Sequence, residues 1–297
     1  MAFNWQTFRT RTLTAIIFAA VMLVGLLWNF WSFFILFSII HFGCWWEYLK
    51  LVEKINTVKI DIAIKILLML SGYILFLNIG IRWIHYDFFI GNGEMMISLK
   101  WIFFLGLAGL LLVYLFQNKT IPFKAKWMTV AGFIYISLSW GLMISLYKGY
   151  DIHVYDTMYV LGENVYLPLL IIISIWINDT MAYIVGSIIG KRPLSKISPK
   201  KTWEGTIGGI ILSIAVVGLI AFYGLNLEWL TFIVMIIAGI AAIAGTFGDL
   251  LESKLKRMAG VKDSGNIMPG HGGFLDRFDS LLLATLFVWL YVNMILH

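Results

Sequence analysis

The residues best suited to chemistry gather in segment 248–280, within a chain in which only 13% of residues are charged. Four of them have the i, i+3, i+4 and i+7 spacing of one helix face: Asp249, Glu252, Ser253 and Lys256. Two further acids, Asp276 and Asp279, come just before the last apolar run. Proteins usually hold Mg²⁺ with one or two carboxylates and leave phosphate oxygens to complete its shell. Carboxylates beside lysines and arginines therefore predict nucleotide chemistry here.

The loop inside this segment is rich in glycine and carries a histidine. Its glycines are Gly260, Gly265, Gly270, Gly272 and Gly273. Glycine takes positive φ and lets the backbone approach a ligand closely, although a merely flexible loop is the alternative. His271 is flanked by glycines and is a candidate donor to a phosphate oxygen or a leaving pyrophosphate. The alternative is a turn histidine that only shapes the loop.

An acid upstream lies inside an apolar run. Asp179 follows Asn178 within the run 166–188, and an ionisable group at a helix centre costs about 2.5 to 3.5 kcal/mol. Asp179 is therefore a functional candidate, with an interhelical hydrogen bond as the alternative. Gly186 and Gly190 follow at a four-residue spacing, which predicts close helix packing.

The next loop is basic. Ser198-Pro199 fits an N-cap followed by proline at the first helical position, so the sequence predicts that the seventh apolar helix begins there. Lys200 and Lys201 would then lie in its first turn. Free backbone N–H groups and two ammonium groups would form a phosphate cradle, and simple anchoring at the cytoplasmic side of a membrane is the alternative.

These residues must be positioned by membrane-spanning helices. The hydrophobic share of 61% and mean hydropathy of +0.89 exclude an ordinary soluble protein. We expect an all-α polytopic transmembrane helical bundle with about nine spans, at 13–28, 31–49, 60–81, 99–117, 126–147, 166–188, 206–225, 230–250 and 280–296. The first run is expected to be a retained helix rather than a cleaved signal peptide. The first two spans, joined tightly around Asn29, would form a helical hairpin.

Loop charges predict the orientation. With the N-terminus inside, the expected outer loops hold only Arg82 and Lys148 among the Lys and Arg residues outside the spans, which favours an N-in, C-out topology. The net charge of +6 is explained in this way, and nucleic acid is not an expected partner. The single cysteine, Cys44, excludes an internal disulfide. We expect one integrated membrane domain, with helices of low chemical content in residues 1–160 and the catalytic helices and cytoplasmic loops in 161–297.

The motifs resemble a known family. The runs 253–265 and 269–280 closely resemble the signature of phosphatidate cytidylyltransferases, also called CDP-diacylglycerol synthases. Segments 179–183 and 198–205 look like two further motifs of that family, in the same order. The resemblance covers roughly the C-terminal two-fifths of the chain, and the N-terminal part is similar in topology only.

The resemblance implies transfer of the cytidylyl group of CTP to phosphatidic acid, giving CDP-diacylglycerol and pyrophosphate for phospholipid biosynthesis. It implies Mg²⁺, with a second cation in a two-metal centre, and Asp249 and Asp276 as metal ligands before Glu252 and Asp279. The catalytic candidates are Asp249, Asp276, His271, Lys256 and Arg277. The substrate-binding candidates are Asp179, Ser198, Lys200, Lys201, Thr202, Ser253, Arg257, Lys262, Gly272 and Gly273. A homodimer in a bacterial cytoplasmic (inner) membrane, with its site at the cytoplasmic face, is the expected context.

Two alternatives stay open. A CTP-dependent kinase for a polyprenol or similar lipid would also join a cytidine nucleotide to a membrane, but its hydroxyl acceptor would need a general base. An ion-coupled transporter would use Asp179 as its coupling carboxylate. Transporters usually place polar groups near the midplane, whereas this chain gathers them at one expected interface.

Overall fold

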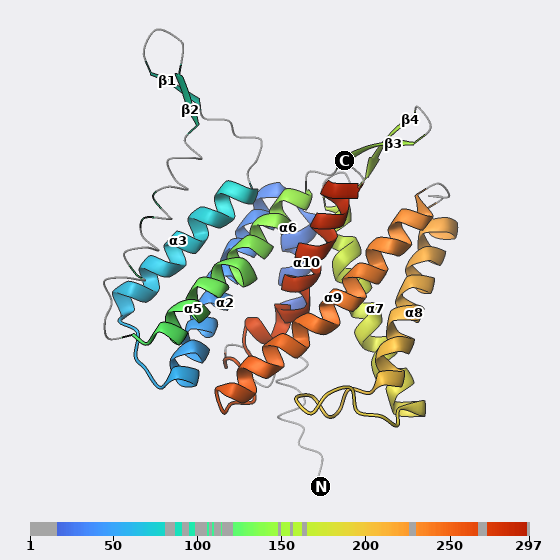
Figure 1. Cartoon of the computed structure of the whole chain (residues 1–297). Coiled ribbons are helices and arrows are strands. Elements are labelled where there is room, and N and C mark those ends of the chain that lie inside the picture. Colours follow the sequence, from blue (N-terminus) through green and yellow to red (C-terminus); the bar gives the residue numbers. More distant parts are fainter. Residues whose placement is uncertain are drawn as a thin grey trace. The chain divides into compact units, whose positions relative to one another are not determined.

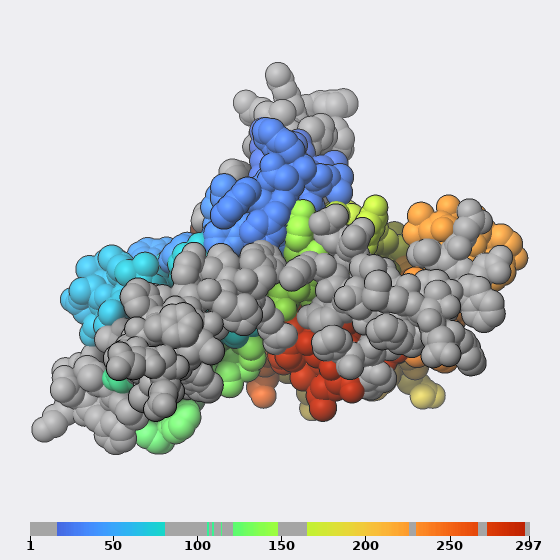
Figure 2. Space-filling view, turned by 90° about the horizontal axis from the view of Figure 1, so that it is seen from above, coloured from blue at the N-terminus to red at the C-terminus, as the bar shows by residue number. Residues whose placement is uncertain are grey.

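In the computed structural model of the chain (Figure 1), the described residues are 17–80, 121–147, 165–225, 230–266 and 272–295, with the strand segments 87–90, 95–98, 150–154 and 157–161 and positions 106, 109 and 114. Residues outside these ranges are grey in Figures 1 and 2. Six of the described helices are long and apolar enough to cross a membrane. The chain is an all-α integral membrane protein. The count of nine spans and the N-in, C-out topology stay predictions.

The helices follow the apolar runs of the sequence. Their bounds are Ile17–Leu27, Phe30–Asn56 (α2), Ile62–Gly80 (α3), Phe123–Gly132 (α5), Ser139–Tyr147 (α6), Tyr166–Ile189 (α7), Trp203–Leu219 (α8), Thr231–Met258 (α9) and Leu275–Ile295 (α10). Two π-helical segments, Phe133–Leu138 and Ile220–Gly224, join α5 to α6 and extend α8. The expected span 99–117 lies almost wholly outside the described residues. The ends of α9 and α10 that flank the polar segment extend beyond the expected spans, because a helix can continue past its apolar part.

Two short hairpins lie in segments that the sequence indicated only as loops. β1 (Asp87–Ile90) pairs antiparallel with β2 (Met95–Ser98), with Asp87 opposite Ser98. β3 (Tyr150–Val154) pairs antiparallel with β4 (Thr157–Leu161), with Tyr150 opposite Leu161. Their aromatic and β-branched content favours extended backbone. Neither hairpin alters the helical class of the protein.

The chain divides into two compact units. Unit 1 takes in the described residues of Met1–Ser145 together with Asp263–Leu275, and unit 2 those of Leu146–Lys262 and Asp276–His297. The part of the glycine-rich loop from Asp263 to Leu275 therefore belongs to the same unit as the N-terminal helices. The expected division at residue 160 into helices of low and high chemical content stays a prediction.

In unit 1, local signals start α2 and a buried polar cluster fixes its middle. The Oδ1 atom of Asn29 accepts from the backbone N–H of Ser32 at 2.9 Å, while the Asn29 N–H donates to Ser32 Oγ, which completes a capping box. The Ser32 hydroxyl also donates to the carbonyl of Gly25, which supports the expected helical hairpin. Deeper in α2, Trp45 Nε1 donates to Ser137 Oγ at 2.8 Å, and Nε2 of His41 lies 3.0 Å from the same oxygen.

In unit 2, glycines let helices pack closely. A Cβ atom on Gly205 of α8 would lie 2.7 Å from the carbonyl oxygen of Ala182 on α7, and one on Gly209 would lie equally close to the carbonyl of Asn178. The close packing expected at Gly186 is confirmed, because the Cα of Gly205 lies beside it. α9 and α10 also approach closely, since a Cβ on Gly248 would lie 2.5 Å from the carbonyl oxygen of Asp279. These contacts fix the helices that line the candidate site.

Candidate active site

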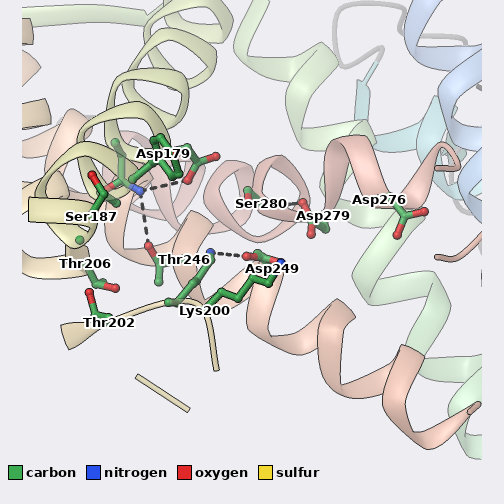
Figure 3. A pocket seen from close by; sticks show the side chains of 15 residues that line it. Asp179, Ser187, Lys200, Thr202, Thr206, Thr246, Asp249, Asp276, Asp279 and Ser280 are labelled. Atoms are coloured by element: carbon green, nitrogen blue, oxygen red, sulfur yellow. Dashed lines mark hydrogen bonds and ion pairs between the residues drawn. The ribbon is translucent and has the colours of Figure 1, made fainter. Parts of the chain in front are cut away.

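A pocket of about 490 Å³ lies within unit 2 (Figure 3). Its wall combines acids, bases and hydroxyl groups from α7, α8, α9, α10 and the loop before α8. The predicted site residues in this wall are Asp179, Lys200, Lys201, Thr202, Asp249, Asp276 and Asp279. Asn178, Tyr183, Ser187, Thr206, Thr246 and Ser280 also line it and were not among the predicted site residues. The pocket thus brings together all three motifs that the sequence singled out.

Two carboxylates of the pocket wall form a tight group with a third, buried one. Asp249, Glu252 and Asp279 each offer an oxygen, and these atoms all lie within 4.8 Å of one another. Glu252 is fully buried, and Asp279 is only 8% exposed. The expected helix face on α9 is confirmed, since the Ser253 hydroxyl lies 3.3 Å from Asp249 Oδ1. Like charges this close disfavour each other's ionised form, and a neighbouring cation removes that cost.

Two lysines supply positive charge to these acids. Lys201 forms an ion pair with Asp249, and Lys256 forms one with Glu252. Lys256 also reaches Asp276, with Nζ 2.6 Å from Oδ1. Two ammonium groups, of Lys201 and Lys256, therefore lie among four carboxylates, of Asp249, Glu252, Asp276 and Asp279. In this part of unit 2 the acids are in excess, which suits a cation site with bases at its edge.

The donor set fits Mg²⁺, which is held by carboxylate oxygens and substrate phosphates. Neither oxygen of the buried Glu252 carboxylate has a hydrogen bond of good geometry among the described residues, although Lys256 pairs with it. Asp249, Glu252 and Asp279 would hold the ion. Asp276, predicted from the sequence as a first-choice ligand, lines the same pocket but is paired with Lys256. Its metal role stays a prediction.

The loop before α8 differs from the sequence expectation. The helix begins at Trp203 with Thr202 as its N-cap, so the predicted N-cap at Ser198 with Pro199 at the first helical position is wrong. An isolated β-bridge pairs Pro193 with Thr202, whose backbone is extended, and the helix begins directly after it. Thr202 Oγ1 accepts from the backbone N–H of Gly205 at 3.1 Å.

This correction changes the expected phosphate cradle. Lys200 and Lys201 precede the helix and do not lie in its first turn. Two backbone N–H groups at its start are already bonded, that of Trp203 to the carbonyl of Arg192 and that of Gly205 to Thr202. Both lysines nevertheless line the pocket, so their ammonium groups remain the phosphate-binding candidates of this loop.

Asp179 lies on the pocket wall beside a buried amide. The Nδ2 atom of Asn178 donates to Asp179 Oδ1 at 3.4 Å and to Thr246 Oγ1 at 3.5 Å. Asn178 is only 2% exposed and bonds across from α7 to α9. The interhelical hydrogen bond considered as the alternative for Asp179 is thus made by its neighbour, and Asp179 itself faces the pocket (Figure 3).

Several predicted residues lie outside the pocket wall as the structure describes it. Arg257 is exposed, and its guanidinium donates to the carbonyl of Val261 at 3.2 Å. The other described residues in this group are Ser198, Glu252, Ser253, Lys256, Lys262, Arg277, Gly272 and Gly273. His271 and Gly270 lie outside the described residues. The roles predicted for all of these stay predictions.

Glu47 was missed by the sequence reasoning. It lies in α2, is 2% exposed, and accepts hydrogen bonds from three donors in the loop Asp263–Leu275. The signal was present, because Glu47 is an acid inside the expected span 31–49, the same feature that drew attention to Asp179. Its partners are more than two hundred positions away in sequence, so local spacing cannot reveal them.

Comparison with known proteins identifies the family. The sequence profile of the cytidylyltransferase family matches residues 9–295, nearly the whole chain. The chain belongs to the cytidylyltransferase family. The family match extends over the N-terminal helices, where the sequence motifs alone indicated only a similar topology.

Individual relatives carry one name. A Staphylococcus saprophyticus protein named phosphatidate cytidylyltransferase is 40% identical over 154 residues, which are 51% of this chain and 58% of that protein. A Staphylococcus epidermidis protein of the same name is 35% identical over 188 residues, 62% of this chain and 68% of its own. An Arabidopsis thaliana relative, phosphatidate cytidylyltransferase 4, chloroplastic, is 45% identical over 118 residues, 39% of this chain and 29% of its own. The matches to the two bacterial relatives thus span between about half and two thirds of those proteins.

Proposed function

We propose that the protein transfers the cytidylyl group of CTP to phosphatidic acid, giving CDP-diacylglycerol and pyrophosphate. The observation that carries this proposal is the pocket in which a cluster of acids on α9 and α10 meets two lysines of the loop before α8. Acids and bases in one cavity suit a polyphosphate and its counter-ion. The names of the family relatives support the same reaction.

The chemistry requires no strong base. A phosphate monoester has a second pKa of about 6, so the phosphate of phosphatidic acid is largely dianionic at neutral pH. One of its oxygens attacks the α-phosphorus of CTP in line with the bond to the β-phosphate. The new P–O bond forms while the α–β bond breaks, and pyrophosphate leaves with the bonding electron pair. The pocket therefore has to orient two anions rather than create a nucleophile.

Charge neutralisation is the main task of the side chains. Lys200 and Lys201 would bind phosphate oxygens at one side of the pocket. Lys256 keeps the carboxylates of Glu252 and Asp276 compensated, so it would act mainly on the acids. When bound by Asp249, Glu252 and Asp279, Mg²⁺ would supply positive charge to the transferring phosphate. A second cation in a two-metal centre belongs to the same proposal.

The proposed setting follows from the substrates. Phosphatidic acid resides in the lipid bilayer and CTP in the cytoplasm, so we place the reaction at the cytoplasmic face of a bacterial inner membrane. A homodimer is part of this proposal. No nucleic acid is required.

The experiment that tests this proposal measures which phosphate of CTP is transferred to lipid. Purified protein in lipid micelles receives phosphatidic acid and Mg²⁺ with CTP labelled at either the α- or the γ-phosphate. We expect only the α-label to enter lipid, with one pyrophosphate released per lipid product. In a parallel reaction with a polyprenol or other lipid alcohol in place of phosphatidic acid, entry of the γ-label would instead establish the kinase reaction. Incorporation of neither label would overturn the proposal.

A further inference from the structure

Glu47 holds the glycine-rich loop of unit 1 through both of its carboxylate oxygens. Oε2 accepts from the hydroxyl of Ser264 at 2.8 Å and from the backbone N–H of Leu275 at 2.8 Å. Oε1 accepts from the backbone N–H of Phe274 at 3.0 Å. These donors stand near the two ends of the loop Asp263–Leu275. One side chain of α2 therefore joins the beginning of the loop to its end.

The glycines of the loop make room for this carboxylate. A Cβ atom on Gly265 or on Gly273 would collide with the carboxylate of Glu47, and one on Gly43 of α2 would collide with the ring of Phe274. From the sequence, we expected these glycines to let a ligand approach or to take positive φ. In the structure, Gly265 and Gly273 instead leave space for the Glu47 side chain. The described parts of the loop, on both sides of residues 267–271, therefore lie against Glu47.

The carboxylate of Glu47 is stabilised by hydrogen-bond donors rather than by a basic side chain of the described residues. Within the part of the chain that the structure describes, no lysine or arginine forms an ion pair with it. Its partners are one hydroxyl and two backbone N–H groups, and α10 begins at one of these, Leu275. A negative charge at a helix N-terminus is favoured, and hydrogen bonds to a charged group are stronger than those between neutral groups. Glu47 is in effect the cap of α10, supplied by another helix.

We infer that Glu47 is a positioning residue for the reaction. It fixes the first residue of α10, and the chain continues directly into Asp276 and then Asp279. Loss of the anchor would let the start of α10 fray or shift, and with it the acids of the first turn. A misplacement of about 1 Å costs on the order of 10²-fold in rate. This catalytic consequence rests on the proposed function, whereas the anchoring itself does not.

The test compares Glu47→Gln with Glu53→Gln. Glu53 lies on the same helix and makes a similar set of contacts, accepting from the N–H of Ile60 at 2.7 Å and pairing with Lys65 at 2.7 Å. Hydrogen exchange is measured on peptides covering 272–280 of the full-length protein, and kcat and KM are measured with CTP. In Glu47→Gln we expect exchange there to become about tenfold faster and kcat to fall by about tenfold or more, with KM changing less. Glu53→Gln should leave both readouts unchanged.

The outcomes separate the two proposals. Unchanged exchange at 272–280 in Glu47→Gln would overturn the anchor, and faster exchange with unchanged kcat would overturn its role in positioning. If the wild-type protein lacks CTP-dependent transfer, the proposed function fails while the exchange measurement still decides the anchor. Should Glu47→Gln not fold, Ser264→Ala removes a single donor to Glu47. It should accelerate exchange to a smaller degree, and no change would count against the anchor.

Discussion

Lys256 of α9 and Asp276 of α10 are joined by a hydrogen-bonded ion pair, with 2.6 Å between Nζ and Oδ1. The same ammonium group pairs with Glu252, whose carboxylate is fully buried. One cation therefore compensates two acids on neighbouring helices. This arrangement makes Lys256 a structural requirement of the acidic cluster as well as a candidate for catalysis.

Lys256→Met should destabilise the protein markedly. Breaking a buried ion pair from one side costs about 3 to 5 kcal/mol, because the remaining charge stays buried without a partner. We expect a lower midpoint of thermal unfolding in detergent. Adding Glu252→Gln to this variant should recover part of the loss, since the uncompensated charge disappears. Lys254→Met, at an exposed position of α9, is the control and should unfold like the wild type. Equal midpoints for the two single variants would contradict the pairing.

The cluster Asp249, Glu252 and Asp279 should bind Mg²⁺ without substrate. Ligand binding to the folded state at 100 times its Kd stabilises by about 2.7 kcal/mol, so saturating Mg²⁺ should raise the unfolding temperature. Asp279→Asn should remove most of this rise and reduce turnover by at least about 100-fold. Asp61→Asn changes an exposed acid that accepts from the N–H of Ala63, and it should keep the full response to Mg²⁺. A full response in Asp279→Asn would exclude Asp279 as a ligand.

Lys201 should contribute to substrate binding. Its side chain lines the pocket and pairs with Asp249, whereas Lys196 of the same loop is exposed and is not part of the described pocket wall. Lys201→Met should lower kcat/KM by about tenfold, equivalent to about 1.4 kcal/mol of transition-state stabilisation. Lys196→Met should leave this ratio within about twofold of wild type. Equal ratios in the two variants would remove Lys201 from the site.

Gly248→Ala tests the close approach of α9 and α10. The added methyl group would lie 2.5 Å from the carbonyl of Asp279, so one helix must move. Overpacking of this kind costs about 1 to 3 kcal/mol, and here it would also displace Asp279 from Asp249. We expect lower stability together with reduced turnover and weaker Mg²⁺ binding. Gly224→Ala, whose new methyl group would have its nearest neighbour at 3.8 Å, should be neutral. Normal Mg²⁺ binding in Gly248→Ala would show that this approach does not set the cluster.

The sequence predicted the helices well because apolar runs of spanning length carry a strong signal. It also placed Asp249, Glu252 and Ser253 on one face of α9, since side chains three or four positions apart on a helix point to the same side. The start of α8 was misplaced because Ser198-Pro199 and Thr202 are both acceptable local starts. In the structure Thr202 is the residue that pairs with Pro193 in a β-bridge, and local sequence does not predict such pairing. The pairing of Asp276 and the partners of Glu47 depend on tertiary contacts for the same reason.

The shared membership of α2 and the loop Asp263–Leu275 in one unit bears on how the protein can be divided. A fragment starting at residue 161 would retain every candidate acid and base named from the sequence motifs. It would nevertheless lack Glu47, so the amides of Phe274 and Leu275 would lose their acceptor. The signature motif therefore does not contain all the residues that hold its loop in place. Any graft or truncation that aims to keep its loop in shape must carry a helix from the opposite end of the chain.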